Sequence, residues 1–190
     1  GIHEFDSPTG DWLLVLDDAG LRLGPPGARR RAPTPVPAAP RPEAIGETVV
    51  FDNDDSGNGN LLVSQAATID RGATLRELNF FVSAPAGRLR LGIYDSSGPD
   101  QLPGKLIASS EELTPVTGWN HALVHVPTQL AAGTYWLSYL ASDNALHFRR
   151  AGQNSGTSFA APYPYAALPA EYPANPQSLT DQWSFYGSMR

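Results

Sequence analysis

The residues that could do chemistry are few in this 190-residue chain, and they form no catalytic motif. The sequence has no Cys, which excludes thiol catalysis, zinc–thiolate sites and disulfides. It contains no G-x-S-x-G turn, no H-E-x-x-H motif and no glycine-rich phosphate loop that opens a helix. His121 and His125 stand four residues apart, about 13 Å along a strand, which is too far for one metal ion. Adjacent acids such as Glu111 and Glu112 indicate surface turns and not a glycosidase pair. We therefore expect no enzyme.

The run DNDDSGNGN at 52–60 concentrates oxygen-bearing side chains beside glycines. Asp52, Asp54 and Ser56, followed by Gly57, resemble the first half of a calcium loop. Val63 stands where the distal bidentate Glu of such a loop would fall. The run therefore predicts one of two structures. One is a structural calcium site with Asp52, Asp54 and Asp55 as ligands, and the other is a polar turn between two strands.

Carbohydrate binding needs flat aromatic faces for C–H stacking and polar groups that hydrogen-bond hydroxyls. The stretch 144–172 offers both kinds of side chain, and its prolines would hold the rings outward at low entropic cost. The alternative is that the tyrosines only cover the end of a β-domain. The candidate ligand-binding residues are Tyr163, Tyr165, Tyr172, Asn144, His147, Arg149, Gln153 and Asn154.

The net charge and the lack of a long apolar stretch argue against nucleic acid and membrane as partners. The formal net charge is −6, whereas a nucleic-acid binder needs a basic surface. No stretch approaches the roughly 20 consecutive apolar residues of a membrane-spanning helix. We expect neither nucleic-acid binding nor a membrane span.

The elements that must position the candidate residues are strands. Eighteen Gly and eighteen Pro punctuate the sequence, and no window shows sustained helical periodicity. Short apolar or alternating runs at regular spacing predict an all-β fold, an antiparallel β-sandwich. The predicted strands are 47–51, 61–67, 74–83, 87–95, 105–112, 119–126, 133–141, 144–150 and 181–186.

Alternation within two of these strands predicts the core. Every second residue of 78–82 and 89–93 is large and apolar, and the intervening residues are polar, so one face of each strand is buried. Three tryptophans stand among apolar neighbours and are also expected to pack inside. The predicted inward residues are Leu78, Phe80, Val82, Leu89, Leu91 and Ile93, the outward ones are Glu77, Asn79, Arg88 and Arg90, and the packing tryptophans are Trp119, Trp136 and Trp183.

The N-terminal part has a different character. Residues 1–5 look like an expression scar, and 6–24 contain two apolar runs around an Asp-Asp-Ala-Gly turn, which predicts a β-hairpin. A hairpin of this size needs a partner surface, either the main domain or the same hairpin of other chains, as in the stem of a trimeric fibre. Residues 25–46 are proline-rich and predict an extended linker, and the β-sandwich is expected over 47–190.

Five phrases of the sequence carry a resemblance to a known family. Together they resemble a jelly-roll domain of bacterial-virus fibre proteins, related bacterial surface proteins and carbohydrate-active enzymes, where it is similar to a carbohydrate-binding module. More loosely, the chain resembles head-spike and tail-fibre proteins of gene transfer agents, which adsorb to host capsular polysaccharide. The phrases are LRLGIYDSSG at 89–98, PGKLIAS at 103–109, TGWN at 117–120, LAAGTYWLSYL at 130–140 and QWSFYGS at 182–188.

The resemblance implies a function and a place for the chain. It implies recognition of a cell-surface polysaccharide by a virus-like fibre or spike outside the cell, on a virion or particle surface. It also implies a homo-oligomer, a trimer among the options, joined to a virion or particle protein through its N-terminal region. The alternatives are a structural or interaction cap of a fibre, an accessory binding module of a polysaccharide-degrading enzyme, and an esterase or lyase. No binding residue transfers from the family, because binding loops vary most.

Overall fold

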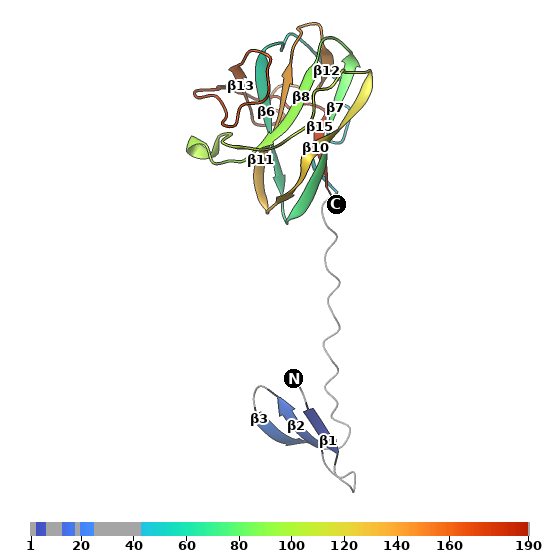
Figure 1. The fold of residues 1–190 in the computed structure, drawn as a ribbon, viewed down its shortest axis with the longest axis vertical. Helices are drawn as coiled ribbons and strands as arrows, with labels where there is room; N and C mark the ends of the chain where they lie inside the picture. The colour runs from blue at the N-terminus through green and yellow to red at the C-terminus, as the bar shows by residue number, and fades with distance from the viewer. Residues whose placement is uncertain (1–2, 7–12, 18–19, 25–42, 190) are drawn as a thin grey trace. The chain divides into compact units, whose positions relative to one another are not determined.

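The computed structural model describes residues 3–6, 13–17, 20–24 and 43–189, and for the first three ranges it describes the backbone alone. The chain divides into two compact units, residues 1–39 and 40–190 (Figure 1). In the described ranges both units are built from strands, and the only helical element is one 3₁₀ turn at Pro99–Gln101. No helix in these ranges is long and apolar enough to cross a membrane.

The N-terminal unit contains a three-stranded antiparallel sheet in the order β1-β2-β3. The strands are β1 (His3–Asp6), β2 (Leu13–Asp17) and β3 (Gly20–Gly24). β2 and β3 pair from Leu13↔Gly24 to Asp17↔Gly20. Residues of the supposed scar also lie in β1, where His3 pairs with Leu16, so this run takes part in the sheet. Most of the predicted linker, residues 25–42, lies outside the described residues.

The C-terminal unit is a β-sandwich of two antiparallel sheets with six described strands each (Figure 1). The first, here called the β7 sheet, has the order β4-β15-β7-β12-β5, and β10 also pairs with β7. Its strands are β4 (Ala44–Gly46), β5 (Asn53–Asp55), β7 (Ala73–Ala84), β10 (Gly118–Leu130), β12 (His147–Arg150) and β15 (Phe185–Met189).

The second sheet, here called the β11 sheet, has the order β14-β13-β6-β11-β8-β9. Its strands are β6 (Leu61–Ile69), β8 (Leu89–Tyr94), β9 (Leu106–Ser109), β11 (Gly133–Ala141), β13 (Ser158–Pro162) and β14 (Gln177–Leu179). The all-β sandwich predicted from the alternation is therefore confirmed.

The core lies between the two sheets, where the alternation predicted it. The six predicted inward residues of β7 and β8 have no exposed surface, and burial of each such side chain is worth about 1.5–3 kcal/mol. Phe80 lies at the centre, with its ring 4.8 Å from Tyr139, 5.3 Å from Phe185 and 5.5 Å from Phe148. Trp136 and Trp183 are buried as predicted.

One buried amide connects the two sheets. Gln65 of β6 accepts a hydrogen bond from the Trp183 backbone N–H at 2.7 Å. Its side-chain nitrogen donates to the Trp183 and Phe185 carbonyl oxygens at 3.3 and 3.2 Å. A buried amide is tolerated when its polar atoms are paired, so Gln65 fixes how β6 lies against the chain entering β15.

Several element boundaries differ from the prediction. Residues 47–51 form no strand, and the sandwich begins at β4, inside the predicted linker. Gly46 ends β4 with a φ of +96°, and a Cβ there would overlap the Leu137 side chain and lie 2.6 Å from the Phe185 carbonyl oxygen. The last strand is Phe185–Met189 and not 181–186. Strands β13 and β14 lie within residues 151–180, where no strand was predicted.

Two residues on the outer face of the β7 sheet have an unexpected environment. Asn79 points away from the core as predicted, yet it is fully covered, and it donates a hydrogen bond to Ser188 Oγ at 2.9 Å. Trp119 was expected inside, but it pairs with Phe81 on the outer face of the β7 sheet. The register turns its neighbours Asn120 and Ala122 inward, so the tryptophan stays half-buried outside.

Candidate functional site

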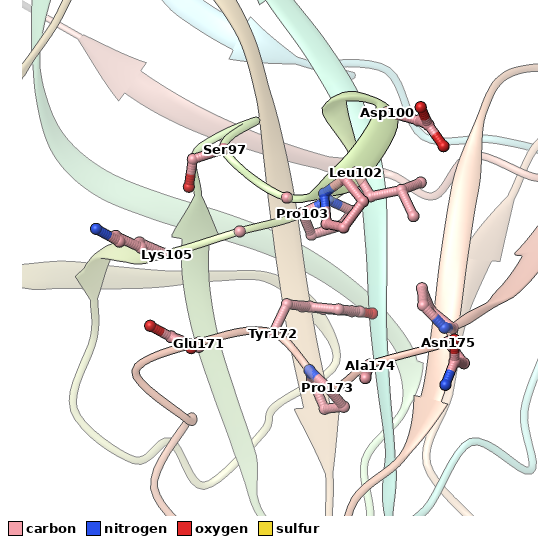
Figure 2. A pocket seen from close by; sticks show the side chains of 14 residues that line it. Ser97, Asp100, Leu102, Pro103, Lys105, Glu171, Tyr172, Pro173, Ala174 and Asn175 are labelled. Atoms are coloured by element: carbon pink, nitrogen blue, oxygen red, sulfur yellow. The ribbon is translucent and has the colours of Figure 1, made fainter.

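A pocket of about 510 Å³, here called the loop pocket, lies between two loops of the C-terminal unit (Figure 2). The first loop connects β8 to β9, and the second lies between β13 and β14. The lining residues are 97–100 and 102–105 of the first loop and 171–176 of the second. Its volume falls in the ordinary range for small-ligand sites.

Backbone hydrogen bonds hold the two loops together. The Tyr172 N–H donates to the Gly104 carbonyl oxygen at 2.8 Å, and the Leu106 N–H donates to the Ala170 carbonyl oxygen at 2.9 Å. Lys105 and Glu171 form an isolated antiparallel bridge between these bonds. The pocket is therefore a fixed feature of the fold.

The Asp95 carboxylate shapes the first loop. One of its oxygens accepts bonds from Ser97 Oγ at 2.6 Å, Ser97 N at 3.1 Å and Lys105 N at 2.7 Å. Burial acts to raise the pKa of Asp95, but the hydrogen bonds from Ser97 and Lys105 outweigh it and hold the pKa below its ordinary value. The ionised carboxylate thus closes the turn that forms one wall of the pocket.

Three residues in or next to the pocket lining have a strained backbone conformation. Asp100, Gln101 and Asn175 have φ values of 52°, 62° and 54°, the left-handed region that side chains other than glycine rarely adopt. Such strain is often concentrated at ligand sites. Four prolines, Pro99, Pro103, Pro173 and Pro176, also line the pocket and restrict its walls.

Tyr172 forms the floor of the pocket. Figure 2 shows its side chain extending between Pro103 and Pro173. The ring is only 8% exposed, lies edge-on to Tyr94, and its hydroxyl donates to the Leu62 carbonyl oxygen at 2.9 Å. Burial raises the pKa of the Tyr172 hydroxyl well above its ordinary value. Tyr172 therefore offers a ligand little of its ring and mainly supports the second loop.

The rim of the pocket carries the charged groups. Asp100, Lys105 and Glu171 are all exposed, and Ser97 and Asn175 add a hydroxyl and an amide. Neither lining carboxylate is buried, so the rim presents solvated charged and polar groups to a ligand.

Tyr163 and Tyr165 lie outside the loop pocket, half-buried over the outer face of the β11 sheet. The Tyr163 hydroxyl donates to the Ala167 carbonyl oxygen at 3.2 Å. The Tyr165 hydroxyl donates to Glu112 at 3.1 Å, and the Arg90 guanidinium lies 5.6 Å from its ring centroid. Burial, followed by this carboxylate, raises the pKa of Tyr165 to about 12. Both rings thus cover a sheet, as in the alternative interpretation, and keep part of their surface exposed.

The predicted polar residues do not gather around the tyrosines. Asn144, Gln153 and Asn154 are exposed in turns, where Asn144 Oδ1 accepts from the Gly59 N–H at 2.9 Å and the Asn154 N–H donates to Thr180 Oγ1 at 3.3 Å. His147 and Arg149 lie on β12, in the β7 sheet. The eight predicted residues are thus divided over the two sheets and separate turns.

The three candidate calcium ligands do not form one ligand set. Asp54 faces outward and accepts bonds from His147 Nδ1 at 2.6 Å and Ser83 Oγ at 2.7 Å. Asp55, its neighbour in β5, points to the opposite face and accepts from Trp183 Nε1 at 2.8 Å. Successive strand residues point to opposite faces, so Asp54 and Asp55 cannot share one ion. In the part of the chain that the structure describes, no group of three or more His, Cys, Asp or Glu residues could hold a metal.

The sequence analysis missed the first loop of the pocket. Its signal was the run DSSGPDQLPG at 95–104, whose Ser, Gly, Pro and Asp residues are typical of a tight turn. Nothing in that run indicates that the turn meets residues 171–176.

In comparisons with known proteins, no protein-family model matches the sequence, and no curated protein matches it.

Proposed function

We propose that residues 40–190 form a carbohydrate-binding domain whose loop pocket receives one sugar residue of a cell-surface polysaccharide. The observation that carries the proposal is a preformed hollow of about 510 Å³ with rigid apolar walls and polar groups at its rim. A sugar residue presents an apolar C–H surface edged with hydroxyls, which suits such a lining.

The proposal includes the setting implied by the sequence resemblance. The domain is a jelly roll at the tip of a virus-like fibre or spike, and the two packed antiparallel sheets support this type of sandwich. A rim open to water gives weak binding at each site. Several copies on one particle then raise the avidity by factors of about 10²–10⁴. The N-terminal sheet is the region that joins copies to one another and to a particle protein.

A structural or interaction module is the second candidate function, and one observation favours it. Three large apolar residues in or just before β10 are strongly exposed, with Val116 at 57%, Leu123 at 72% and Val126 at 69%. Exposed apolar residues grouped along one strand can mark a protein contact. In this alternative β10 docks on another protein of the fibre, and the domain binds no sugar.

Two variants test the loop pocket by whole-cell binding to capsulated and acapsular bacteria. Ala174→Trp fills the pocket from an exposed position, and Asn175→Gly removes the amide while glycine accepts the φ of 54°. We expect Ala174→Trp to abolish binding to capsulated cells. We expect Asn175→Gly to weaken it about tenfold, the effect of losing about 1.4 kcal/mol.

Asn154→Gly is the matched control, because Asn154 is also exposed, has a φ of 62° and lies outside the pocket. It should bind like the unchanged protein. Unaltered binding of both pocket variants would remove the loop pocket from the site. Equal binding to capsulated and acapsular cells would contradict the carbohydrate function and favour the protein-contact alternative.

A further inference from the structure

A second surface lies on the outer face of the β7 sheet, on elements that the loop pocket does not use. Three half-buried rings form an aromatic row there, with Trp119 of β10 next to Phe81 of β7 and Tyr186 of β15. The Trp119 ring centroid lies 5.5 Å from Phe81 and 5.0 Å from Tyr186, and both pairs meet edge to face. The core does not need this row, because Phe80 and Phe185 fill the inner face of the same strands.

One end of the row opens into a hollow of about 420 Å³, here called the outer hollow. Phe81 and Ser83 of β7 belong to its lining, together with Arg149 of β12. The loop between β4 and β5 adds Phe51 and Asp52, and the turn before β10 adds Thr117. No residue lines both the outer hollow and the loop pocket.

Hydrogen bonds hold this lining in place. The Phe51 N–H donates to Ser184 Oγ at 2.9 Å, and the Phe81 N–H donates to the Ser184 carbonyl oxygen at 3.0 Å. Arg149 Nη1 donates to the Asp52 carbonyl oxygen at 3.0 Å. The loop carrying Asp52 is therefore tied both to β12 and to the chain entering β15, so a ligand would meet a preformed surface.

The Asp52 carboxylate and the Arg149 guanidinium remain available in this lining. In the described part of the chain no hydrogen bond or ion pair engages the Asp52 carboxylate, which is exposed. Arg149 uses Nη1 for the Asp52 carbonyl and lies 4.0 Å from Asp54 Oδ1, so most of its donors are uncommitted. The carboxylate of Asp52, which accepts hydrogen bonds, and the guanidinium of Arg149, which donates them, thus line the same hollow as the ring of Phe81.

We propose that the outer hollow is a second binding site and that its ligand is a neutral sugar residue of a glycan. A sugar places its C–H face on Phe81 and uses neighbouring hydroxyls to donate to Asp52 and accept from Arg149. The lining holds one carboxylate, Asp52, and one guanidinium, Arg149, and nearby Asp54 is already paired with His147. The lining therefore has no positive surplus to attract an acidic sugar, whose carboxylate would be repelled by Asp52.

The second site changes how the domain engages a polymer. Two sites on one domain let it hold two residues of the same polysaccharide or two neighbouring chains. The inference does not rest on the loop pocket, since each site can be removed without changing the lining of the other.

Affinity electrophoresis of the full chain tests the inference. The gels contain neutral polysaccharides (dextran, galactomannan or xyloglucan) or acidic ones (alginate or hyaluronate). We expect retardation by at least one neutral polymer and by neither acidic one. Asp52→Asn and Arg149→Gln should each weaken the neutral binding at least about tenfold, as expected when a charged hydrogen-bonding partner is lost.

Asp70→Asn and Arg71→Gln are the matched controls, because they make the same exchanges in an exposed ion pair outside the hollow. Both should be retarded like the unchanged protein. Ala174→Trp, which fills only the loop pocket, distinguishes the two sites. Retention that vanishes in Ala174→Trp but survives in Asp52→Asn would keep the proposed function and overturn the second site. Retention by acidic polymers alone, or by none of the five, would also overturn it.

The fluorescence of Trp119 gives a second test of binding at the outer hollow. Of the three tryptophans that the structure describes, Trp136 and Trp183 are buried, whereas Trp119 lies half-buried against Phe81 of the hollow. Addition of the retarding neutral polymer should change the tryptophan fluorescence, and Trp119→Phe should remove that change while it keeps an aromatic ring. A fluorescence change that persists in Trp119→Phe would place the binding elsewhere.

Discussion

Leu91 lies at the centre of β8 with none of its surface exposed. An ionised carboxylate there would have no partner, and an uncompensated buried charge costs about 3–5 kcal/mol. We expect Leu91→Asp to lose the cooperative thermal transition that the sandwich should show. Circular dichroism during heating measures this.

Leu123→Asp is the matched control, because Leu123 is 72% exposed on the outer face of β10. That variant should melt like the unchanged protein. A normal melting curve for Leu91→Asp would contradict the inward facing of β8.

Two aromatic side chains show that residue type alone does not determine whether a residue is buried or available to a ligand. Tyr172 has the residue type expected of a sugar-stacking ring, yet its hydroxyl donates to the Leu62 carbonyl oxygen and its ring packs at right angles to that of Tyr94. Trp119 has the residue type expected of a core residue, yet it lies outside. Residue type alone predicted the opposite role for each, because exposure depends on strand pairing and not on the side chain.

At the scale of elements, the edge strand β5 is held to β12 partly by a charged hydrogen bond. His147 Nδ1 donates to Asp54, and this bond, followed by one from Ser83, holds the pKa of Asp54 below its ordinary value of 3.8. A carboxyl group with a lowered folded pKa adds stability that is present above about pH 3.8 and lost as the pH falls through the folded value.

Asp54→Asn should therefore lower the melting temperature near neutral pH, and the difference from the unchanged protein should shrink as the pH falls below about 3.8. The effect is small, less than about 1 kcal/mol, because both side chains are over 40% exposed and solvent screens the pair. Melting curves at a series of pH values check it. A difference that stays constant down to the most acidic sample would contradict the coupling.

The prediction from sequence was least accurate for residues 151–180. No strand was predicted there, whereas Ser158–Pro162 pairs with β6 and Gln177–Leu179 pairs with β13. Ala160 and Ala161 are buried in this pairing. Small apolar residues give a weak periodic signal, and the partner strand β6 lies far away in the sequence, so local reasoning could not find β13.

At the scale of the whole molecule, the N-terminal unit is a sheet of three described strands, which is about the minimum for independent stability. The sequence supplies it with apolar residues, among them Leu13, Val15 and Leu21. We expect the full chain to be a homo-oligomer through this unit, with a trimer among the options, and residues 43–190 produced alone to be a monomer with an unchanged thermal transition. Sedimentation velocity and calorimetry of the two proteins measure this. A monomeric full chain would contradict the oligomer and remove the avidity argument.

Local pattern was sufficient for part of this protein. The alternation of Leu89, Leu91 and Ile93 determined the buried face of β8, because successive strand residues point to opposite sides. The abundance of Gly and Pro and the lack of helical periodicity determined the all-β class. His147 and Arg149 lie on β12, within the strand predicted at 144–150, although not beside the tyrosines.

Only the tertiary structure decided which segments meet. The loop pocket joins residues 97–105 to 171–176, and the outer hollow joins Asp52, Phe81 and Arg149 from three parts of the chain. These segments come together because of the order of strands in each sheet. That order follows from long-range pairing and from the packing of one sheet on the other. A periodic pattern states which face a residue takes, but it carries no information about which distant strand will lie beside it.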